Sequence, residues 1–389
     1  MNQYMIGWGH TRFGKRPGID LEDLVVEAAQ EALEDAAIDP AEIDAIFVGH
    51  FNSGMSPQDF AAPLALQADE RLRFKPATRT ENACASGSAA IHQGLTSLAA
   101  GTARRVLVVG VEKMTDAGAA QVADSLLGAS YRKSDLAETR LGFAGVFARI
   151  AETYFEAFGE QSDVLARIAA KNHKNGLRNP FAHLQKDFDF EFCNAVSDKN
   201  PMVAEPLRRT DCSPVTDGAA AVVLSDESGI ADANRAIRFR STAHMTDFMP
   251  MNRRDMTELA AAGRAWATAL DRAGVSNADL GFAEVHDCFT IAELMIYEAM
   301  GLTEKGQGRR AIEEAWVTKD GSLPINPSGG LKAKGHPVGA TGVSMHVMTA
   351  KQLAGEAGDM QLPSPTMAGV FNMGGVAVAN YASVLERVR

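Results

Sequence analysis

The sequence is short of cysteine and has no long run of apolar or of basic residues. Its 389 residues include four cysteines, Cys84, Cys193, Cys212 and Cys288, none of them in a Cys-x-x-Cys pair. Cysteines this scattered argue against a disulfide framework, so each is expected to be a free thiol, either buried or reactive. No apolar run approaches 18 residues and no secretory leader is apparent, so no membrane span is expected and a cytoplasmic location is the default.

Acidic residues outnumber basic ones, and this limits the partners. The formal net charge is −11, from 38 Lys and Arg against 49 Asp and Glu. Without a long basic tract, neither non-specific nucleic-acid binding nor binding to anionic membranes is expected. Hydrophobic residues make up 46% of the chain and charged residues 22%, as in an ordinary globular protein. An anionic ligand would therefore need a local site.

Two stretches far apart in the chain share one pattern. Residues 32–50 and 269–287 align without a gap, with Leu33 opposite Leu270 and Val48 opposite Val285. Each indicates an amphipathic helix, a turn and a strand, followed by a segment rich in small residues and then an apolar strand. This predicts an internal duplication, although such units can also resemble each other by chance.

The duplication suggests how the chain divides. Residues 1–115 together with 214–245 are predicted to form the first half, and residues 246–389 the second. Residues 116–213 lie between them and are richer in charged and aromatic residues, with helices expected near 147–158 and 163–174. We therefore expect an inserted domain there, which is a natural place for ligand contacts.

Two residues at the starts of the small-residue segments are candidate catalytic groups. Cys84 lies where the first helix should begin, and the free N–H groups there would lower its pKa and favour a thiolate. His336, in Gly335-His336-Pro337, holds the mirrored position in the second half and could take the proton of a nearby thiol. The alternatives are a small buried cysteine and a hydrogen-bonded structural histidine.

Two later segments carry further candidates. In residues 286–289, His-Asp-Cys-Phe, the side chains of His286 and Cys288 should project to one side at the end of a strand. A zinc site and a plain core cysteine are the competing interpretations. Residues 372–375, Asn-Met-Gly-Gly, indicate either an ordinary tight turn or a backbone N–H aimed at an oxyanion. No phosphate-loop or dinucleotide pattern is present, so ATP and NAD are not expected.

Together these residues resemble the thiolase superfamily over nearly the whole chain. The matching motifs are, in order, Cys84-Ala85-Ser86, Asp217-Gly218-Ala219-Ala220 and Gly335-His336-Pro337. Most thiolases carry an Asn-Glu-Ala-Phe motif and a late Cys-x-Gly motif. This chain has residues 286–289 and Asn372-Met373-Gly374 at those places, so Cys288 looks like the replacement for the late cysteine. The combination is similar to the sterol-carrier-protein-type thiolases.

The resemblance implies an α/β fold: a five-layered αβαβα core from two duplicated halves, with a loop domain inserted in the first. It implies an acetyl-CoA acyltransferase of lipid and fatty-acid metabolism, with coenzyme A as substrate and neither cofactor nor metal. The catalytic residues would be Cys84, His286, Cys288 and His336, and the backbone N–H groups of Cys84 and Gly374 would hold an oxyanion.

The resemblance also implies partners. These would be acyl-CoA, coenzyme A and further copies of the chain in a homodimer or homotetramer, with a small accessory protein as another partner to consider. Five basic residues of the insert could meet the coenzyme A phosphates, although a charge cluster is more often a solvated face. They are Lys171, Lys174, Arg178, Arg208 and Arg209.

Other functions stay open. Retro-aldol cleavage of a hydroxyacyl-CoA would use the same fold but needs no acylated cysteine, so Cys84 argues against it. A non-catalytic acyl-CoA-binding subunit would have no need to keep four candidate catalytic residues together. Ketoacyl synthases share the fold, but their Cys-His-His or Cys-His-Asn sets match this chain less well.

Overall fold

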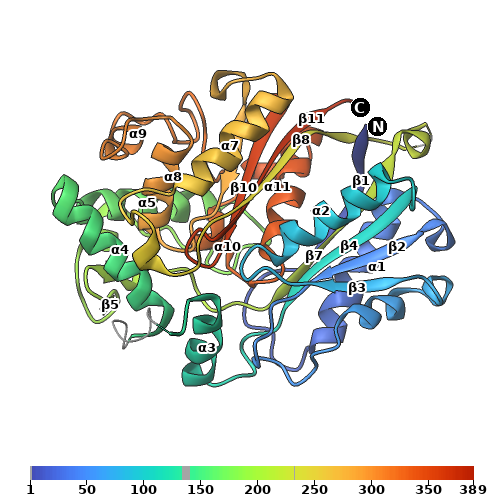
Figure 1. Ribbon diagram of the computed structural model, residues 1–389, viewed down its shortest axis with the longest axis horizontal. Helices are drawn as coiled ribbons and strands as arrows, with labels where there is room; N and C mark the ends of the chain where they lie inside the picture. The colour runs from blue at the N-terminus through green and yellow to red at the C-terminus, as the bar shows by residue number, and fades with distance from the viewer. Residues whose placement is uncertain (1, 134–140, 232) are drawn as a thin grey trace.

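The computed structural model describes residues 2–133, 141–231 and 233–389. Within these residues, nine strands form one large sheet (Figure 1). They are β1 (Gln3–His10), β2 (Ala45–Gly49), β3 (Ala77–Thr80), β4 (Arg105–Glu112), β7 (Gly218–Asp226), β8 (Ile237–Thr246), β9 (Phe282–Val285), β10 (Met367–Gly374) and β11 (Ala379–Arg387). Their order across the sheet is β3-β2-β4-β7-β1-β8-β11-β10-β9.

The two halves of this sheet have the same strand pairing, which confirms the predicted duplication. In the first half β2 is parallel to β4, β4 is antiparallel to β7, and β7 is antiparallel to β1. The second half repeats this with β9, β10, β11 and β8 in the same roles. The halves meet where β1 pairs briefly with β8, and β3 adds a parallel strand at the outer edge of the first half.

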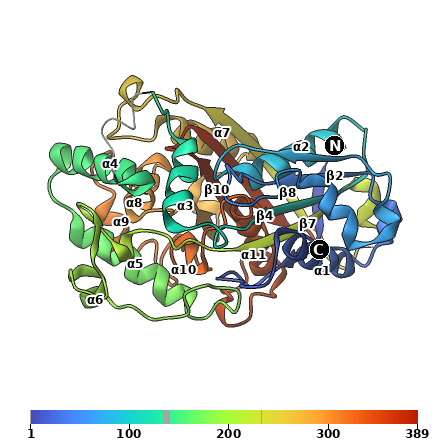
Figure 2. The same cartoon turned by 90° about the horizontal axis from the view of Figure 1, so that it is seen from below.

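Four helices complete the five layers. The outer helices are α1 (Leu21–Ala36), which packs on β1 and β7, and α7 (Ala260–Ala273), which packs on β8 and β11. The inner helices α2 (Ser86–Ala99) and α11 (Thr341–Ala354) pack against each other between the two halves of the sheet (Figures 1 and 2). The αβαβα core predicted from the resemblance is therefore confirmed.

Local sequence explains why these elements form. Helix α1 begins with a reciprocal cap, in which the side chains of Asp20 and Asp23 each accept the other's backbone N–H. Strand β4 is almost wholly buried, as expected where helices cover both faces of a sheet. In the central layer, a Cβ on Gly87 would lie only 2.8 Å from the carbonyl oxygen of Gly339, so the two inner segments can approach only because the residue is glycine.

The insert between β4 and β7 covers one end of the molecule (Figure 2). It contains α3 (Ala119–Leu126), α4 (Gly142–Phe158), α5 (Ser162–Gly176), α6 (Phe190–Asn194) and the hairpin of β5 (Met202–Ala204) with β6 (Leu207–Arg208). The helices expected near 147–158 and 163–174 are confirmed as α4 and α5. Helix α5 packs against α8 (Thr290–Ala299), α9 (Arg309–Glu313) and α10 (Gly330–Lys334), so the insert rests on the second half.

The predicted boundary between residues 245 and 246 falls near the end of β8 and so assigns almost all of this strand to the first half. Strand β8 pairs with β11 along nearly its full length but with β1 only at Tyr4 and Met5. By this pairing β8 belongs to the second half, and we place the division before Ile237. Sequence alone could not decide this, because β1 and β8 hold equivalent places on either side of the centre. No helix in the described part of the chain is long and apolar enough to cross a membrane.

Candidate active site

Cys84 lies on a tight turn between β3 and α2. Helix α2 begins two residues later at Ser86, and Ala83 takes a left-handed conformation with φ of 50°. The Ser86 hydroxyl accepts the N–H of Asn82 at 2.9 Å and donates to the carbonyl of Ala83 at 2.6 Å. The turn is thus held by its own hydrogen bonds, and it places the thiol, which is 3% exposed, near the helix start as predicted.

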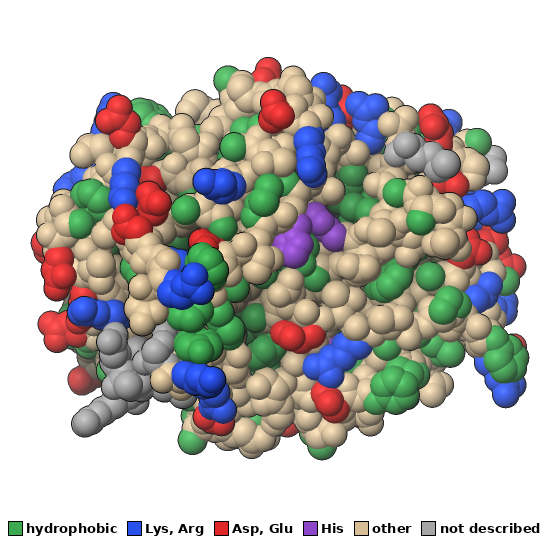
Figure 3. Space-filling model, viewed as in Figure 1, with side chains coloured by type: hydrophobic (Ala, Val, Ile, Leu, Met, Phe, Trp, Pro, Cys, Tyr) green, Lys and Arg blue, Asp and Glu red, His purple; other side chains and the backbone are tan. Residues whose placement is uncertain are grey.

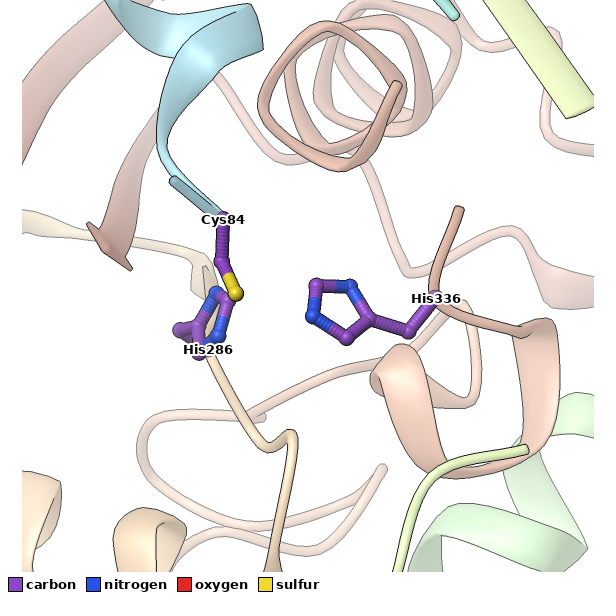
Figure 4. Close-up of side chains that lie close together, drawn as sticks. All are labelled: Cys84, His286 and His336. Carbon is purple, nitrogen blue, oxygen red and sulfur yellow. The ribbon is translucent and has the colours of Figure 1, made fainter. Parts of the chain in front are cut away.

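Two histidines from the second half of the chain lie beside this thiol (Figure 4). His286 directly follows β9, and His336 lies between α10 and α11. The sulfur of Cys84 and one ring nitrogen of each histidine lie within 4.8 Å of one another. The two imidazole rings are nearly perpendicular, at 86°, with their centres 5.1 Å apart. His336 is therefore near the thiol as predicted, but it precedes α11, which begins at Thr341, and does not start it.

Burial keeps these groups uncharged in the resting protein. Desolvation raises the pKa of Cys84 to about 12, and a hydrogen bond from the backbone N–H of Gly375 only partly offsets it. Desolvation also lowers the pKa of His336 to about 3 and that of His286 well below its ordinary value. The prediction of a lowered thiol pKa is therefore wrong for the resting protein, because the loss of hydration outweighs the nearby N–H groups.

Cys288 is buried close enough to Cys84 for a charge on Cys84 to affect the ionisation of Cys288. Burial raises the pKa of Cys288 well above its ordinary value, and the charges of Cys84 and Asp287 add to this. The Asp287 carboxylate instead accepts the backbone N–H groups of Leu331 at 2.6 Å and Lys332 at 3.1 Å. Asp287 thus anchors α10, while its neighbour Cys288 lies near Cys84.

The glycine turn after β10 packs against the turn that carries Cys84. A Cβ on Gly374 would lie 2.2 Å from the carbonyl oxygen of Asn82, so this close approach requires glycine. The backbone N–H groups of Gly375 and of Cys84 itself both act to lower the pKa of the thiol. The role of the Gly374 N–H toward an oxyanion stays a prediction.

Sequence reasoning missed three buried polar residues that hold the site together. The amide of Asn372 lies 3.3 Å from the carbonyl oxygen of Cys84 and 2.9 Å from His286 Nδ1. The hydroxyl of Thr341 lies 2.6 Å from His336 Nδ1. Glu112, at the end of β4, accepts the N–H of Gly339 at 2.9 Å and thereby joins the two halves. Only Asn372 has a signal in the sequence, as the departure from the late Cys-x-Gly motif.

The Asp217-Gly218-Ala219-Ala220 motif has a structural role. The Asp217 carboxylate accepts the backbone N–H groups of Met114 at 2.7 Å and Thr115 at 2.8 Å, and the Lys113 ammonium at 2.8 Å. These hydrogen bonds tie the start of β7 to the end of β4. The motif therefore fixes both ends of the insert.

The five predicted phosphate-binding residues do not form one group. Lys171 and Arg208 are buried and pair with internal carboxylates, Lys171 with Glu293 at 2.5 Å and Arg208 with Asp211 at 2.9 Å. These ion pairs argue against Arg208 as a phosphate ligand, because its guanidinium is also bound to Asn194 and Ser162. Lys171 lines a cavity together with Lys174 and Arg178, so its assignment stays a prediction. The other three are exposed and stay predictions: Lys174, Arg178 and Arg209.

Two cavities are relevant to substrate binding. One, of about 720 Å³, is lined by Asn82, Ala83, Gly374 and Gly375, which flank the thiol. The other, of about 890 Å³, is lined by Lys171, Lys174 and Arg178. None of the four catalytic candidates is among the described lining residues of either cavity, but only the first is lined by the chain neighbours of Cys84. On the face drawn in Figure 3, basic and acidic side chains are interspersed and form no continuous basic surface. The first cavity is therefore the candidate entrance to the site.

The side chains of Cys84, His286 and His336 are of types that can bind a metal ion. Thiolate and imidazole are the ligands that zinc prefers, and the donor atoms of Cys84, His286 and His336 lie close together. The expectation of no metal therefore stays a prediction.

A five-layered duplicated core with a cysteine and two histidines at its centre defines the class of the thiolases. The family model described as "Thiolase, N-terminal domain" matches residues 4–228, and "Thiolase C-terminal domain-like" matches residues 242–387. The chain belongs to the thiolase family.

Curated relatives extend over almost the whole chain. An acetyl-CoA acetyltransferase from Methanothermobacter thermautotrophicus is 34% identical over 385 residues, which cover 98% of this chain and 99% of the relative. Sterol carrier protein 2 from Homo sapiens is 30% identical over 390 residues, which cover 95% of this chain and 69% of the relative. The resemblance to sterol-carrier-protein-type thiolases is confirmed.

Solved structures agree on the fold. Human mitochondrial 3-ketoacyl-CoA thiolase in complex with CoA has a TM-score of 0.76 at 18% identity, covering 100% of this chain and 98% of that one. An aldolase described as Ltp2-ChsH2(DUF35) has a TM-score of 0.83 at 20% identity, also covering 100% and 98%. At these identities the likeness shows the fold alone.

Proposed function

We propose that the protein is a thiolase-type acyltransferase that cleaves 3-ketoacyl-CoA with coenzyme A, or condenses two acyl-CoA molecules in reverse. One observation carries the proposal: Cys84 lies beside two histidines whose Nε2 atoms are buried and have no hydrogen-bond partner among the described residues. Buried polar atoms are usually paired with protein, water or ligand, so these two nitrogens, unlike those bound within the fold, are available to a ligand that reaches the thiol.

The first half-reaction would form an acyl-enzyme at Cys84. As the sulfur attacks the 3-keto carbonyl, His336 takes the thiol proton, and the negative charge passes to the carbonyl oxygen. Because both groups are neutral at rest, the proton moves only with the attack. The bond between the α and β carbons then breaks, and Cys288 gives its proton to the departing acetyl-CoA carbon.

The second half-reaction would return the enzyme to its starting state. Cys288, now a thiolate, takes the proton of the incoming coenzyme A thiol. The coenzyme A sulfur attacks the acyl group and forms the shortened acyl-CoA, and Cys84 recovers its proton from His336. Every proton is returned, so no cofactor is required in either direction.

Two oxyanions need donors during this cycle. The acyl oxygen would lie against backbone N–H groups at Cys84 and Gly374, and the enolate oxygen would lie near the two imidazoles. Loss of one such donor costs on the order of 3 kcal/mol in the barrier.

We propose that the active form is a homodimer or homotetramer, as the resemblance implies. The aldolase with a similar fold is described together with a DUF35 protein, and a small accessory protein is the alternative partner for this chain. Size-exclusion chromatography with light scattering, with and without an added DUF35 protein, distinguishes the two assemblies.

Mass spectrometry of the intact protein tests the proposed function. Incubation with acetoacetyl-CoA should add one acetyl group to the wild type, and Cys84→Ala should add none. Cys193→Ala is the matched control, because Cys193 is also buried but packs within the insert against Ala166 and Ala169. It should label fully.

The outcome separates the competing functions. Acetylation of Cys84→Ala at another residue would remove Cys84 from the mechanism. Cleavage of a 3-hydroxyacyl-CoA without any acyl-enzyme would instead favour retro-aldol chemistry. Tight binding of acyl-CoA with neither reaction would favour a non-catalytic subunit.

A further inference from the structure

The hydroxyl of Thr341 determines where His336 carries its proton. Thr341 donates its only hydroxyl hydrogen to the carbonyl oxygen of Pro337 at 2.9 Å. Its oxygen can then only accept from His336 Nδ1, which lies 2.6 Å away. A neutral His336 therefore carries its proton on Nδ1 and presents a lone pair on Nε2 toward the thiol.

The amide of Asn372 imposes the opposite arrangement on His286. The carbonyl oxygen of Cys84, 3.3 Å away, can only accept a hydrogen bond, so the amide must turn its nitrogen toward this oxygen. The same nitrogen lies 2.9 Å from His286 Nδ1. Because an amide nitrogen only donates, Nδ1 must accept, and a neutral His286 carries its proton on Nε2.

We propose that Asn372 is a positioning residue that holds His286 in the Nε2–H form, opposite to the form of His336. The two unpartnered nitrogens beside Cys84 are then unlike: one accepts a proton and the other donates a hydrogen bond. The catalytic meaning of this difference rests on the proposed function, in which His336 takes the thiol proton and His286 donates to an oxyanion. The hydrogen-bond arrangement itself does not depend on that function.

The same arrangement opposes the capture of zinc by the cluster. To bind one ion with Cys84, both histidines must offer a lone pair at Nε2. His336 already does, but His286 would have to move its proton to Nδ1, where it would face the donor amide of Asn372. Reversing the amide would place its oxygen against the carbonyl oxygen of Cys84. Asn372 therefore disfavours metal binding by Cys84, His286 and His336, although their residue types suit a metal ion.

An aspartate at this position would reverse the effect. In Asn372→Asp a carboxylate oxygen would take the place of the amide nitrogen and accept a hydrogen bond from Nδ1–H of His286, which leaves the lone pair on Nε2. The same oxygen would lie near the carbonyl oxygen of Cys84, so this hydrogen bond forms against some repulsion. Carboxylates that hold metal-binding histidines in this way raise metal affinity by roughly 10- to 100-fold. The variant should therefore turn the catalytic cluster into a metal site.

The first test is a direct measurement on the wild type. NMR of protein labelled in its histidine rings distinguishes the two neutral forms, and the signals are assigned by their loss in His286→Gln and His336→Gln. We expect His286 with its proton on Nε2 and His336 with its proton on Nδ1. A His286 protonated on Nδ1 would overturn the proposal, whatever the variants do.

The second test is titration with Co²⁺, whose bond to a thiolate gives a strong absorption band. Asn372→Asp should bind Co²⁺ at least tenfold more tightly than the wild type, with this band, and the band should vanish when Cys84 is also changed to Ala. Asn82→Asp is the matched control, because it adds a carboxylate on the turn that carries Cys84, at a side chain that contacts Tyr381. It should bind as weakly as the wild type.

The results separate the two proposals. Equal Co²⁺ affinity in Asn372→Asp and the wild type would count against Asn372 as the residue that sets the proton position. If that variant does not fold, the NMR result on the wild type decides. If the two histidines show the expected forms but acetoacetyl-CoA is neither cleaved nor bound covalently, the proposed function fails while the role of Asn372 stands.

Discussion

A methyl group added at Gly342 should separate the two helices at the centre of the protein. A Cβ there would lie 2.2 Å from the backbone nitrogen of Ser88, 2.5 Å from its hydroxyl oxygen and 2.7 Å from the side-chain oxygen of Asn372. Backbone cannot rotate out of the way as a flexible side chain can, so α11 and α2 must move apart by roughly an ångström to reach ordinary contact.

Two opposing effects determine the loss of stability in Gly342→Ala. Overpacking a well-packed core costs about 1–3 kcal/mol, and backbone contact puts this position at or above the upper end. Alanine recovers about 1 kcal/mol within a helix. We expect a net loss of about 2 kcal/mol. The rate of acylation should fall about 100-fold, because α2 begins just after Cys84 and an ångström of misplacement has this effect on a reacting group.

Urea denaturation and the rate of acetylation by acetoacetyl-CoA measure the two effects. Gly118→Ala is the control, since a Cβ there meets nothing within 4 Å and the residue has an ordinary φ of −66°. The control should match the wild type in both measurements. Wild-type stability and rate in Gly342→Ala would refute the argument that backbone contact between α2 and α11 positions the nucleophile.

Three further predictions follow from burial and charge. The raised pKa of Cys84 implies a thiolate fraction at neutral pH about a thousandfold below that of an ordinary thiol. Alkylation of Cys84 by iodoacetamide should therefore be slow, and its rate should still increase above pH 9. Faster alkylation than that of free cysteine at pH 7 would contradict this. Arg208→Ala should lower the free energy of unfolding, measured in urea, by about 3 kcal/mol, because it leaves the Asp211 carboxylate buried without its cationic partner. Arg209 is exposed, so Arg209→Ala should keep the stability of the wild type. Cys288→Ala should still acetylate at Cys84 but no longer exchange the α-proton of acetyl-CoA with D₂O, and wild-type exchange would exclude Cys288 as the acid.

The periodicity of the sequence predicted two equivalent halves, its motifs predicted Cys84 as a candidate nucleophile, and the resemblance carried by those motifs implied the five-layered core. The ungapped match between residues 32–50 and 269–287 predicted two equivalent units, because a duplicated helix–turn–strand unit must bury the same apolar face each time. The small residues after Cys84 predicted a closely packed helix, which is α2. These features depend on short stretches of sequence, so they can be predicted from the residue pattern.

Tertiary structure alone decided the protonation states and the hydrogen-bond partners of the candidate catalytic groups. The sequence around Cys84 indicates free N–H groups that favour a thiolate, but the folded chain buries the sulfur and removes the water that would stabilise its charge. Likewise, Lys171 and Arg208 look like free cations until the fold supplies Glu293 and Asp211.

The hydrogen bond between Asn372 and His286 depends on the fold in the same way. It joins residues 86 positions apart, and it fixes a proton position that no local pattern encodes. The sequence therefore determined which residue types the chain carries to its centre. Burial and long-range hydrogen bonds decided which of them are charged, which are bound and which are left free to react, because both depend on what the rest of the chain places around each group.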